Sequence, residues 1–420
     1  MSRIIVAGGS PLCGELNAPG AKNAALPILA AALLAQHPVR LIDCPRLSDV
    51  YNMIELLRAL GCTVSWEGNV LTIDPRDAQC HELPEHLSKS LRSSIFLLGP
   101  MVGKFGRAIA TFPGGCDIGL RPIDLHITAL GALGVEIEES FGTIHCMGGN
   151  LVGAHIHLDY PSVGATENAM MAAVSASGET VIQNAAREPE ILDLQNFLCK
   201  LGFSVRGAGS SAIYIEGGCN PKPAEHRIMA DRIVTGTYLC AAAITGGDVC
   251  IRGIAPEHLG CVISKLREAG CEVQIGASYL RVIGPKRPRE LKRVETLPHP
   301  GFPTDMQAQI FALCTVAEGT SIIVENVFES RFKHASELTR MGAESSVNGR
   351  IAVIRGVKRL TGANVDARDL RGGAALILAG LRAEGETVVH GAEHVDRGYE
   401  RIERDLAALG ARITRQEEAL

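Results

Sequence analysis

The pattern that organises this chain is clearest at Leu57-Arg58-Ala59-Leu60-Gly61-Cys62-Thr63-Val64, where a helical segment ends in glycine and an alternating strand follows. The same pattern occurs six times along the 420 residues. Its glycines are 68 to 73 residues apart, at Gly61, Gly134, Gly202, Gly270, Gly342 and Gly410. Such regular spacing predicts six copies of one folding unit.

Each copy contains a second helix, which precedes the glycine-ended one and is rich in small residues. Segments that are apolar all round are expected to be buried. Strand-like runs follow these helices, so each copy predicts an α/β unit, and six units predict two domains of three. Examples of the small-residue helices are residues 24–34, 165–174, 233–243, 306–316 and 373–381.

Composition limits the classes of protein to which the chain can belong. A formal net charge of −5 argues against general attraction to nucleic acid or an acidic membrane. The 13 cysteines are an odd number without a Cys-x-x-Cys pair, which favours a reducing compartment. The N-terminus lacks the apolar run of a signal peptide, and the longest apolar run, 24–35, is too short to span a membrane. We therefore expect a soluble, cytoplasmic protein without membrane insertion.

A conspicuous polar residue stands where each buried helix is expected to begin. A helix N-terminus presents unpaired N–H groups and partial positive charge, which suits an anionic ligand. Ordinary N-capping is the alternative for the serine and the first aspartate. Cations oppose the helix dipole at this end, so the basic members predict a bound anion. The six residues are Lys22, Arg92, Ser162, Asp231, Asp305 and Arg371.

A second set of basic residues precedes the glycines by 11 to 15 positions. The guanidinium fork matches phosphate and carboxylate, so several arginines in one cleft predict a substrate with several anionic groups. Solvated surface charge is the alternative for any one of them. The fourth copy has Glu257 nearby instead. The arginines are Arg46, Arg121, Arg187, Arg331 and Arg397.

One loop, 112–121, surrounds Cys116 with three glycines and a proline, which predicts an exposed segment. Arg121 would lower the pKa of the Cys116 thiol and favour reactivity, whereas an inert loop cysteine is the alternative. No Gly-x-Gly-x-x-Gly loop occurs, and residues 20–23 lack the spacing of a nucleotide P-loop. His155 and His157 alternate on a strand without an identifiable third metal ligand. We expect neither a metal nor a cofactor.

Several longer motifs resemble the UDP-N-acetylglucosamine 1-carboxyvinyltransferase family of enolpyruvyl transferases, with similarity from Ile5 to about Ile413. The resemblance implies a two-domain inside-out α/β barrel built from six βαβαββ-type repeats. One domain would be 22–230, and the other 1–21 plus 231–420, with an N-terminal strand completing it. The motifs are residues 19–27, 113–122, 161–166, 184–190, 302–309 and 396–401.

The resemblance also implies an activity. The enolpyruvyl group of phosphoenolpyruvate would pass to the 3-hydroxyl of UDP-N-acetylglucosamine with release of phosphate, which is the first committed step of peptidoglycan biosynthesis. This step would serve cell wall biogenesis, cell shape, the cell cycle and cell division, and fosfomycin would alkylate Cys116. A shikimate-type enolpyruvyl transferase is one alternative, but those sequences lack the Cys-bearing loop. A catalytically silent UDP-sugar-binding regulatory paralogue is the other.

The family's functional residues map onto this sequence by motif. Asp305 would take the proton of the sugar hydroxyl or orient that hydroxyl, and Cys116 would be the general acid. Lys22, Arg121 and Arg397 would hold the phosphate, while Arg331, Arg371 and Arg397 would serve the carboxylate. Tyr160 replaces a lysine that contacts the diphosphate in some members. No obligate protein partner is evident. The residues expected at the UDP-sugar are Asn23, Arg92, Arg121, Pro122, Ile123, Asp124, Leu125, Tyr160, Pro161, Ser162, Val163, Gly164, Asp305 and Val327.

Overall fold

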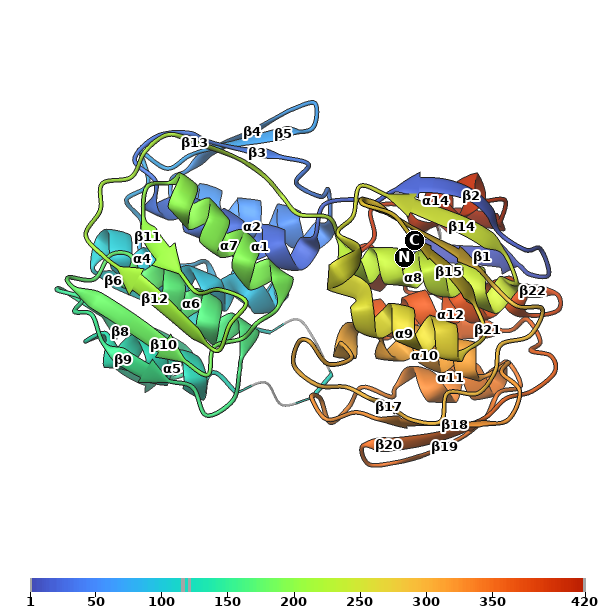
Figure 1. Cartoon of the computed structure of the whole chain (residues 1–420). Coiled ribbons are helices and arrows are strands. Elements are labelled where there is room, and N and C mark those ends of the chain that lie inside the picture. Colours follow the sequence, from blue (N-terminus) through green and yellow to red (C-terminus); the bar gives the residue numbers. More distant parts are fainter. Residues whose placement is uncertain (1, 115–117, 120–121, 418–420) are drawn as a thin grey trace. The chain divides into compact units, whose positions relative to one another are not determined.

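The computed structural model describes residues 2–114, 118–119 and 122–417, which form two compact units. We call them the Lys22 unit and the Asp305 unit. The Lys22 unit contains the described residues of 20–229 other than 118–119, and the Asp305 unit contains 2–19, 118–119 and 230–417 (Figure 1). Apart from residues 118–119, the chain passes between the units at residues 19–20 and again at 229–230.

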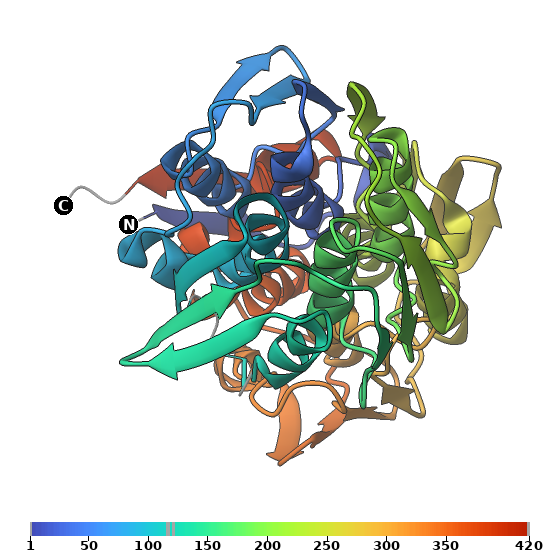
Figure 2. The ribbon, with the colours of Figure 1, turned by 90° about the vertical axis from the view of Figure 1, so that its left-hand side faces the viewer.

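The Lys22 unit has three sheets among its described residues, in the orders β13-β3-β5-β4, β11-β12-β10-β9 and β6-β8-β7. In Figure 2, which faces this unit, the sheets lie outside a central group of helices. The strands are β3 (Val39–Ile42), β4 (Thr63–Glu67), β5 (Val70–Asp74), β6 (Arg107–Thr111), β7 (Glu136–Ser140), β8 (Thr143–Met147), β9 (His155–His157), β10 (Glu179–Gln183), β11 (Ser204–Arg206), β12 (Ala212–Glu216) and β13 (Ala224–Arg227). The helices are α1 (Lys22–Ala31), η1 (Ala32–Leu34), α2 (Ser48–Ala59), α3 (Glu85–Ser90), η2 (Arg92–Leu97), α4 (Leu98–Phe105), α5 (Asp124–Ala132), α6 (Val163–Ala173) and α7 (Pro189–Lys200).

The Asp305 unit also has three sheets in its described part, ordered β21-β22-β1-β23, β15-β16-β14-β2 and β17-β18-β20-β19. Its strands are β1 (Ser2–Ala7), β2 (Cys13–Asn17), β14 (Asp248–Arg252), β15 (Glu272–Ile275), β16 (Tyr279–Ile283), β17 (Val294–Glu295), β18 (Thr320–Val324), β19 (Glu344–Asn348), β20 (Ile351–Arg355), β21 (Asn364–Asp366), β22 (Glu386–His390) and β23 (Arg412–Glu417). Its helices are α8 (Arg232–Thr245), η3 (Pro256–Leu259), α9 (Gly260–Glu268), η4 (Thr304–Met306), α10 (Gln307–Cys314), α11 (His334–Arg340), α12 (Leu370–Arg382), α13 (Ala392–Val395) and α14 (Ile402–Ala408).

The repeat predicted from sequence is present in both units as mixed α/β structure. A buried helix leads to a strand, an outer helix follows, and a hairpin completes the sheet, as in the series α1, β3, α2, β4 and β5. The six marker glycines have backbone φ angles between +90° and +104°. Side chains other than glycine are strained in this left-handed region, so the glycine at the end of each outer helix is confirmed.

Small residues are needed because the central helices pack closely against one another. A Cβ placed on Gly99 of α4 would lie 2.5 Å from the carbonyl oxygen of Asn168 on α6. A Cβ on Gly236 of α8 would lie 2.8 Å from the sulfur of Met306. Both distances are below van der Waals contact, so a larger residue at Gly99 would force α4 away from α6, and one at Gly236 would displace the buried Met306 side chain.

At each of the two places where the chain passes between the units, the strand before the passage pairs with a strand of another repeat. Strand β2 directly precedes α1 in the chain but pairs in parallel with β14, and β13 directly precedes α8 but pairs in parallel with β3. Strand β1 lies between β22 and β23, in the position that the second hairpin strand takes in the other sheets. The N-terminal segment therefore completes two sheets of the Asp305 unit.

Two glycines three residues apart at the end of α5 test the role of the marker position. Gly134 has a φ of +91°, whereas Gly131 is helical, and a Cβ on either would meet no atom closer than 3.7 Å. Gly131→Ala should raise the free energy of unfolding by about 0.5–1 kcal/mol, because alanine is the better helix former. Gly134→Ala should lower it by about 1–2 kcal/mol through backbone strain. Urea denaturation of the two variants measures the difference, and equal effects would contradict the assigned role.

Candidate substrate site

All six polar residues singled out in the sequence lie at or directly before the start of a buried helical segment, as predicted. Lys22 is the first residue of α1, and Arg92 is the first residue of η2, which leads into α4. Asp305 lies in η4 before α10, and Arg371 lies in the first turn of α12. Ser162 and Asp231 are N-caps, accepting hydrogen bonds from backbone N–H groups of α6 and α8, and ligand binding by Ser162 stays a prediction.

Lys22 is buried in the Lys22 unit and forms an ion pair with Asp49 in the first turn of α2. Asp49 is itself only 2% exposed. The carboxylate offsets the unfavourable position of an ammonium group at the start of α1. Sequence analysis did not identify Asp49, because an acidic residue in the first turn of a helix is ordinary on its own.

A charged cluster of the Asp305 unit joins residues from two consecutive repeats, with Asp305 and Arg331 in the fifth copy and Arg371 in the sixth. Asp305 Oδ1 accepts a hydrogen bond from Arg331 Nη2 at 2.6 Å, and Asp305 Oδ2 accepts one from Arg371 Nη2 at 3.1 Å. The two arginine side chains are only 4% and 3% exposed, whereas that of Asp305 is 27% exposed. The structure therefore brings together three residues that the resemblance assigns to the reaction.

The two arginines of this cluster form a carboxylate-binding fork. Neither Nε has a hydrogen-bond partner among the described residues, so each guanidinium retains an unused donor. Burial opposes the charge of Arg371, but Asp305 and Tyr399 outweigh it and raise the pKa of Arg371. A guanidinium that stays charged and has an unused donor is suited to bind a further anion.

The expected UDP-sugar residues of the Lys22 unit gather at the N-termini of α5 and α6. Pro122, Ile123, Asp124 and Leu125 lead into α5, whereas Tyr160, Pro161, Ser162, Val163 and Gly164 lead into α6. A Cβ on Gly164 would lie 3.0 Å from Phe96 and 3.1 Å from His126, so glycine permits the close packing of α6 against α5. Two neighbouring helix N-termini suit a diphosphate.

The remaining expected residues occupy less distinctive positions. Asn23 is the second residue of α1, and Arg92 Nη1 donates to the carbonyl of Pro113 at 3.1 Å. Val327 lies in a turn held by buried Glu325, which accepts its N–H at 2.8 Å. Arg397 is half-buried in the turn between α13 and α14. Tyr160 is 44% exposed.

Some sequence predictions are untested or take the alternative interpretation. Cys116 and Arg121 lie outside the described residues. Arg46 and Arg187 are exposed, and Arg46 stacks on Trp66, with 4.5 Å from its guanidinium carbon to the ring centroid. These two therefore match the surface-charge interpretation. Within the described ranges, no group of three or more His, Cys, Asp or Glu side chains could hold a metal ion.

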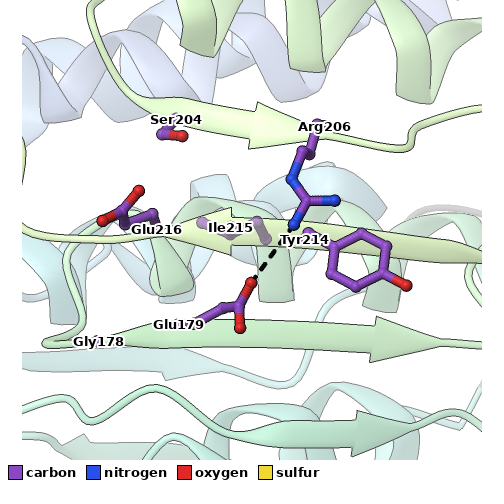
Figure 3. Close-up of a pocket in the computed structure, with 7 residues that line it drawn as sticks. All are labelled: Gly178, Glu179, Ser204, Arg206, Tyr214, Ile215 and Glu216. Carbon is purple, nitrogen blue, oxygen red and sulfur yellow. Dashed lines mark ion pairs between the residues drawn. The ribbon is translucent and has the colours of Figure 1, made fainter.

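A surface pocket on the sheet β11-β12-β10-β9 contains none of the expected residues (Figure 3). Arg206 lies there 3.5 Å from Glu179 and stacks on Tyr214, with 4.2 Å from its guanidinium carbon to the ring centroid. Both charged side chains are more than half exposed. Because its charged residues are exposed and pair with each other, nothing connects this pocket with the expected substrate residues.

Glu167 is a buried carboxyl group that sequence analysis missed. It lies on α6, is fully buried, and neither carboxyl oxygen has a hydrogen-bond partner among the described residues. Burial, and then the charges of Glu190 and Glu188, raise the pKa of Glu167 well above its ordinary value. Burial therefore favours the neutral, protonated form of this side chain more than it would for an exposed glutamate. The only sequence signal was a polar run, Thr166-Glu167-Asn168, inside an apolar helix.

Glu167 predicts a specific dependence of stability on pH. Its pKa is raised in the folded state, so its contribution to stability is complete below the unfolded pKa and decreases as pH rises above it. Glu167→Gln should therefore gain thermal stability relative to the unmodified protein between about pH 5 and pH 8. Melting temperatures across this range measure the effect. Exposed Glu138→Gln is the control, and parallel curves for Glu167→Gln and the unmodified protein would contradict the prediction.

Comparisons with known proteins now define the family. Residues 6–406 match the family model described as EPSP synthase (3-phosphoshikimate 1-carboxyvinyltransferase). UDP-N-acetylglucosamine 1-carboxyvinyltransferase 2 of Caldanaerobacter subterraneus subsp. tengcongensis is 53% identical over 415 residues, covering 99% of this chain and 100% of the relative. The chain belongs to the UDP-N-acetylglucosamine 1-carboxyvinyltransferase family. A second member, from Halothermothrix orenii, is 49% identical, and the match covers 98% of this chain and 99% of the relative.

Solved structures agree with this family assignment. The enolpyruvyl transferase NikO from Streptomyces tendae superimposes with a TM-score of 0.89 at 26% identity, covering 99% of this chain and 98% of its own. EPSP synthase from Acinetobacter baumannii has a TM-score of 0.76 at 18% identity, covering 99% of this chain and 100% of its own, and shows the fold alone. The enolpyruvyl transferase fold expected from the sequence is confirmed.

Proposed function

We propose that this member of the UDP-N-acetylglucosamine 1-carboxyvinyltransferase family transfers the enolpyruvyl group of phosphoenolpyruvate to the 3-hydroxyl of UDP-N-acetylglucosamine. The observation that carries the proposal is the fork of Arg331 and Arg371, which already holds the carboxylate of Asp305 at 2.6 and 3.1 Å. Phosphoenolpyruvate brings a carboxylate of the same chemistry. Curated relatives with about half of their residues identical carry this activity in their names.

The basic residues would neutralise both anionic groups of phosphoenolpyruvate. Arg331, Arg371 and Arg397 would bind its carboxylate, and Lys22, Arg121 and Arg397 would bind its phosphate. Guanidinium groups suit these oxygens because their planar donors match two acceptors at once. Cationic groups also stabilise the charge that develops as the phosphate leaves.

The reaction needs one proton acceptor and one proton donor. Asp305 would accept the proton of the sugar 3-hydroxyl, or orient that hydroxyl. The hydroxyl oxygen of the sugar would form a bond to the central carbon of the enol. Cys116 would protonate the methylene carbon, which gives a tetrahedral intermediate. Loss of a proton from the resulting methyl group then restores the double bond as phosphate leaves. Such paired acid and base steps balance the atoms of the addition and the elimination.

The UDP-sugar would lie at the N-termini of α5 and α6, where backbone N–H groups can bind its diphosphate. Asn23, Arg92 and Val327 complete the set assigned by the family motifs. Tyr160 replaces the lysine of some relatives, so this protein would lack one cationic contact to the diphosphate. Its phenol is half-exposed and offers a polar group in place of that charge.

The cellular setting follows from the same activity. We propose that the protein acts in the cytoplasm at the first committed step of peptidoglycan biosynthesis, and that cell shape and division depend on it. Among the described residues, no helix has the length and apolar character required to cross a membrane. The matching family model carries the description of the shikimate-pathway enzyme, whose acceptor is 3-phosphoshikimate. This compound is therefore the alternative acceptor to be tested.

Phosphate release tests the activity directly. The protein should release phosphate only when phosphoenolpyruvate and UDP-N-acetylglucosamine are both present, and not with 3-phosphoshikimate. Cys116→Ala should lower kcat by about a hundredfold or more, because a general acid contributes that order of rate. Cys80→Ala, at an exposed cysteine outside the expected site, is the control. Phosphate release with phosphoenolpyruvate and 3-phosphoshikimate, but not with UDP-N-acetylglucosamine, would favour the shikimate-type enzyme. Binding of the UDP-sugar without turnover would favour the regulatory paralogue.

Fosfomycin provides a second test of the reactive thiol. The protein should lose activity over time with fosfomycin, and mass spectrometry should find one adduct on the peptide that contains Cys116. Cys116→Asp should resist, because a carboxylate can donate a proton when protonated but does not form the stable thioether. Adducts spread over Cys80 and Cys199, with activity retained, would contradict the assignment of Cys116.

A further inference from the structure

A buried chain of hydrogen bonds lies directly behind the arginine fork of the Asp305 unit. It joins α8, α10 and α12, which pack together in this unit (Figure 1), to Tyr399 in the turn before α14. Tyr399 is 1% exposed. Its hydroxyl oxygen lies 2.8 Å from Thr237 Oγ1 and 3.3 Å from Arg371 Nη1. Gln309 Nε2 donates to Thr237 Oγ1 at 3.0 Å.

The direction of each proton in this chain follows from the donors available. Thr237 gives its single hydroxyl proton to the carbonyl of Ile233 at 2.8 Å, so its oxygen acts as an acceptor toward its other neighbours. Tyr399 stays protonated, since burial is the main cause of a raised pKa at this phenol. Its proton must therefore go to Thr237. The lone pairs of Tyr399 then accept from Arg371 Nη1, which always donates, and more weakly from Gln309 Nε2 at 3.4 Å.

We propose that Tyr399 is a positioning residue for Arg371, and that Thr237 fixes the orientation of the tyrosine hydroxyl. With Nη1 bound to Tyr399, the planar guanidinium can turn only so that Nη2 faces Asp305 Oδ2. The role of Arg371 toward the carboxylate of phosphoenolpyruvate rests on the proposed function. The positioning itself rests on the contacts of the described residues alone.

The geometry favours positioning over simple filling of the core. Arg371 Nε has no partner among the described residues, and the only described hydrogen bonds of its side chain go to Tyr399 and Asp305. The phenol ring also faces the guanidinium, with 5.6 Å between the guanidinium carbon and the ring centroid. Removing the hydroxyl would leave the guanidinium held from one side only. A phenylalanine ring would fill the same space without holding Nη1.

Tyr399→Phe and Tyr238→Phe form a matched pair for the test. Tyr238 is a buried neighbour on α8, 2% exposed, and its hydroxyl donates to Asp405 Oδ2 at 2.5 Å without a hydrogen bond to either fork arginine. Each variant loses one buried hydroxyl, which in Tyr399 contacts Thr237, Arg371 and Gln309 and in Tyr238 contacts Asp405, so both should lose thermal stability. Only Tyr399→Phe should alter the fork.

Crystal structures of both ligand-free variants provide a readout independent of activity. In Tyr399→Phe, Arg371 Nη2 should move out of hydrogen-bond distance of Asp305 Oδ2, whereas Tyr238→Phe should keep the 3.1 Å contact. An unchanged Arg371 in Tyr399→Phe would overturn the proposal. This comparison decides the positioning role even if the protein does not turn over the proposed substrates.

Steady-state kinetics test what the positioning does. Tyr399→Phe should raise the KM for phosphoenolpyruvate about tenfold or more, as expected for a lost hydrogen bond to a charged group, and leave the KM for UDP-N-acetylglucosamine unchanged. Tyr238→Phe should change neither KM. In Tyr399→Phe, equal changes in the KM for phosphoenolpyruvate and in the KM for UDP-N-acetylglucosamine would overturn the proposal. The same change in KM in Tyr399→Phe and Tyr238→Phe would also overturn it.

Thr237 supplies an internal check on the proton directions. Thr237→Val removes the acceptor of the tyrosine proton and should also raise the KM for phosphoenolpyruvate, whereas Thr237→Ser keeps the hydroxyl and should not. The Thr237→Val and Tyr399→Phe double variant should be little worse than Tyr399→Phe alone, because both changes act through one contact. Full additivity would overturn the assigned chain of donors.

Discussion

A helix that is packed on every side can present chemistry only at its ends, and this constraint governs both units of the protein. The small residues of α6, α8 and α12 let these helices pack closely, which buries their sides completely. Their N-terminal N–H groups still need partners. Polar residues therefore collect at the helix starts, and the repeat multiplies this arrangement six times.

The same burial means that each charged side chain near the helix starts needs a partner of opposite charge. Arg331 and Arg371 are almost fully buried, so their charges must be paired, and Asp305 provides that pairing. Their unused Nε donors mark the fork as incompletely satisfied. Removing one partner of such a cluster leaves a buried charge, which explains why several residues must be positioned together. Lys22 and Asp49 follow the same logic in the other unit.

A substantial part of this architecture was predictable from the sequence because it repeats. The marker glycines required left-handed backbone, and each of the six has it. The residues at the helix starts were found by counting from those glycines. Motif resemblance then indicated the family that the comparisons confirm. Sequence alone left capping and ligand binding as alternatives at Ser162 and Asp231; in the structure both side chains cap a helix, and ligand binding by Ser162 stays a prediction.

The sequence by itself determined the period of the repeat, the glycine-ended helices and the order of polar residues, because these are local properties of neighbouring residues. Only the tertiary structure decided the partners. Asp49, Glu167 and Tyr399 gave no distinctive local signal, since their burial and their contacts with other helices and turns have no sequence period. The exchange of β2 and β13 was likewise invisible, because strand pairing depends on which sheet edge is available after the helices have packed.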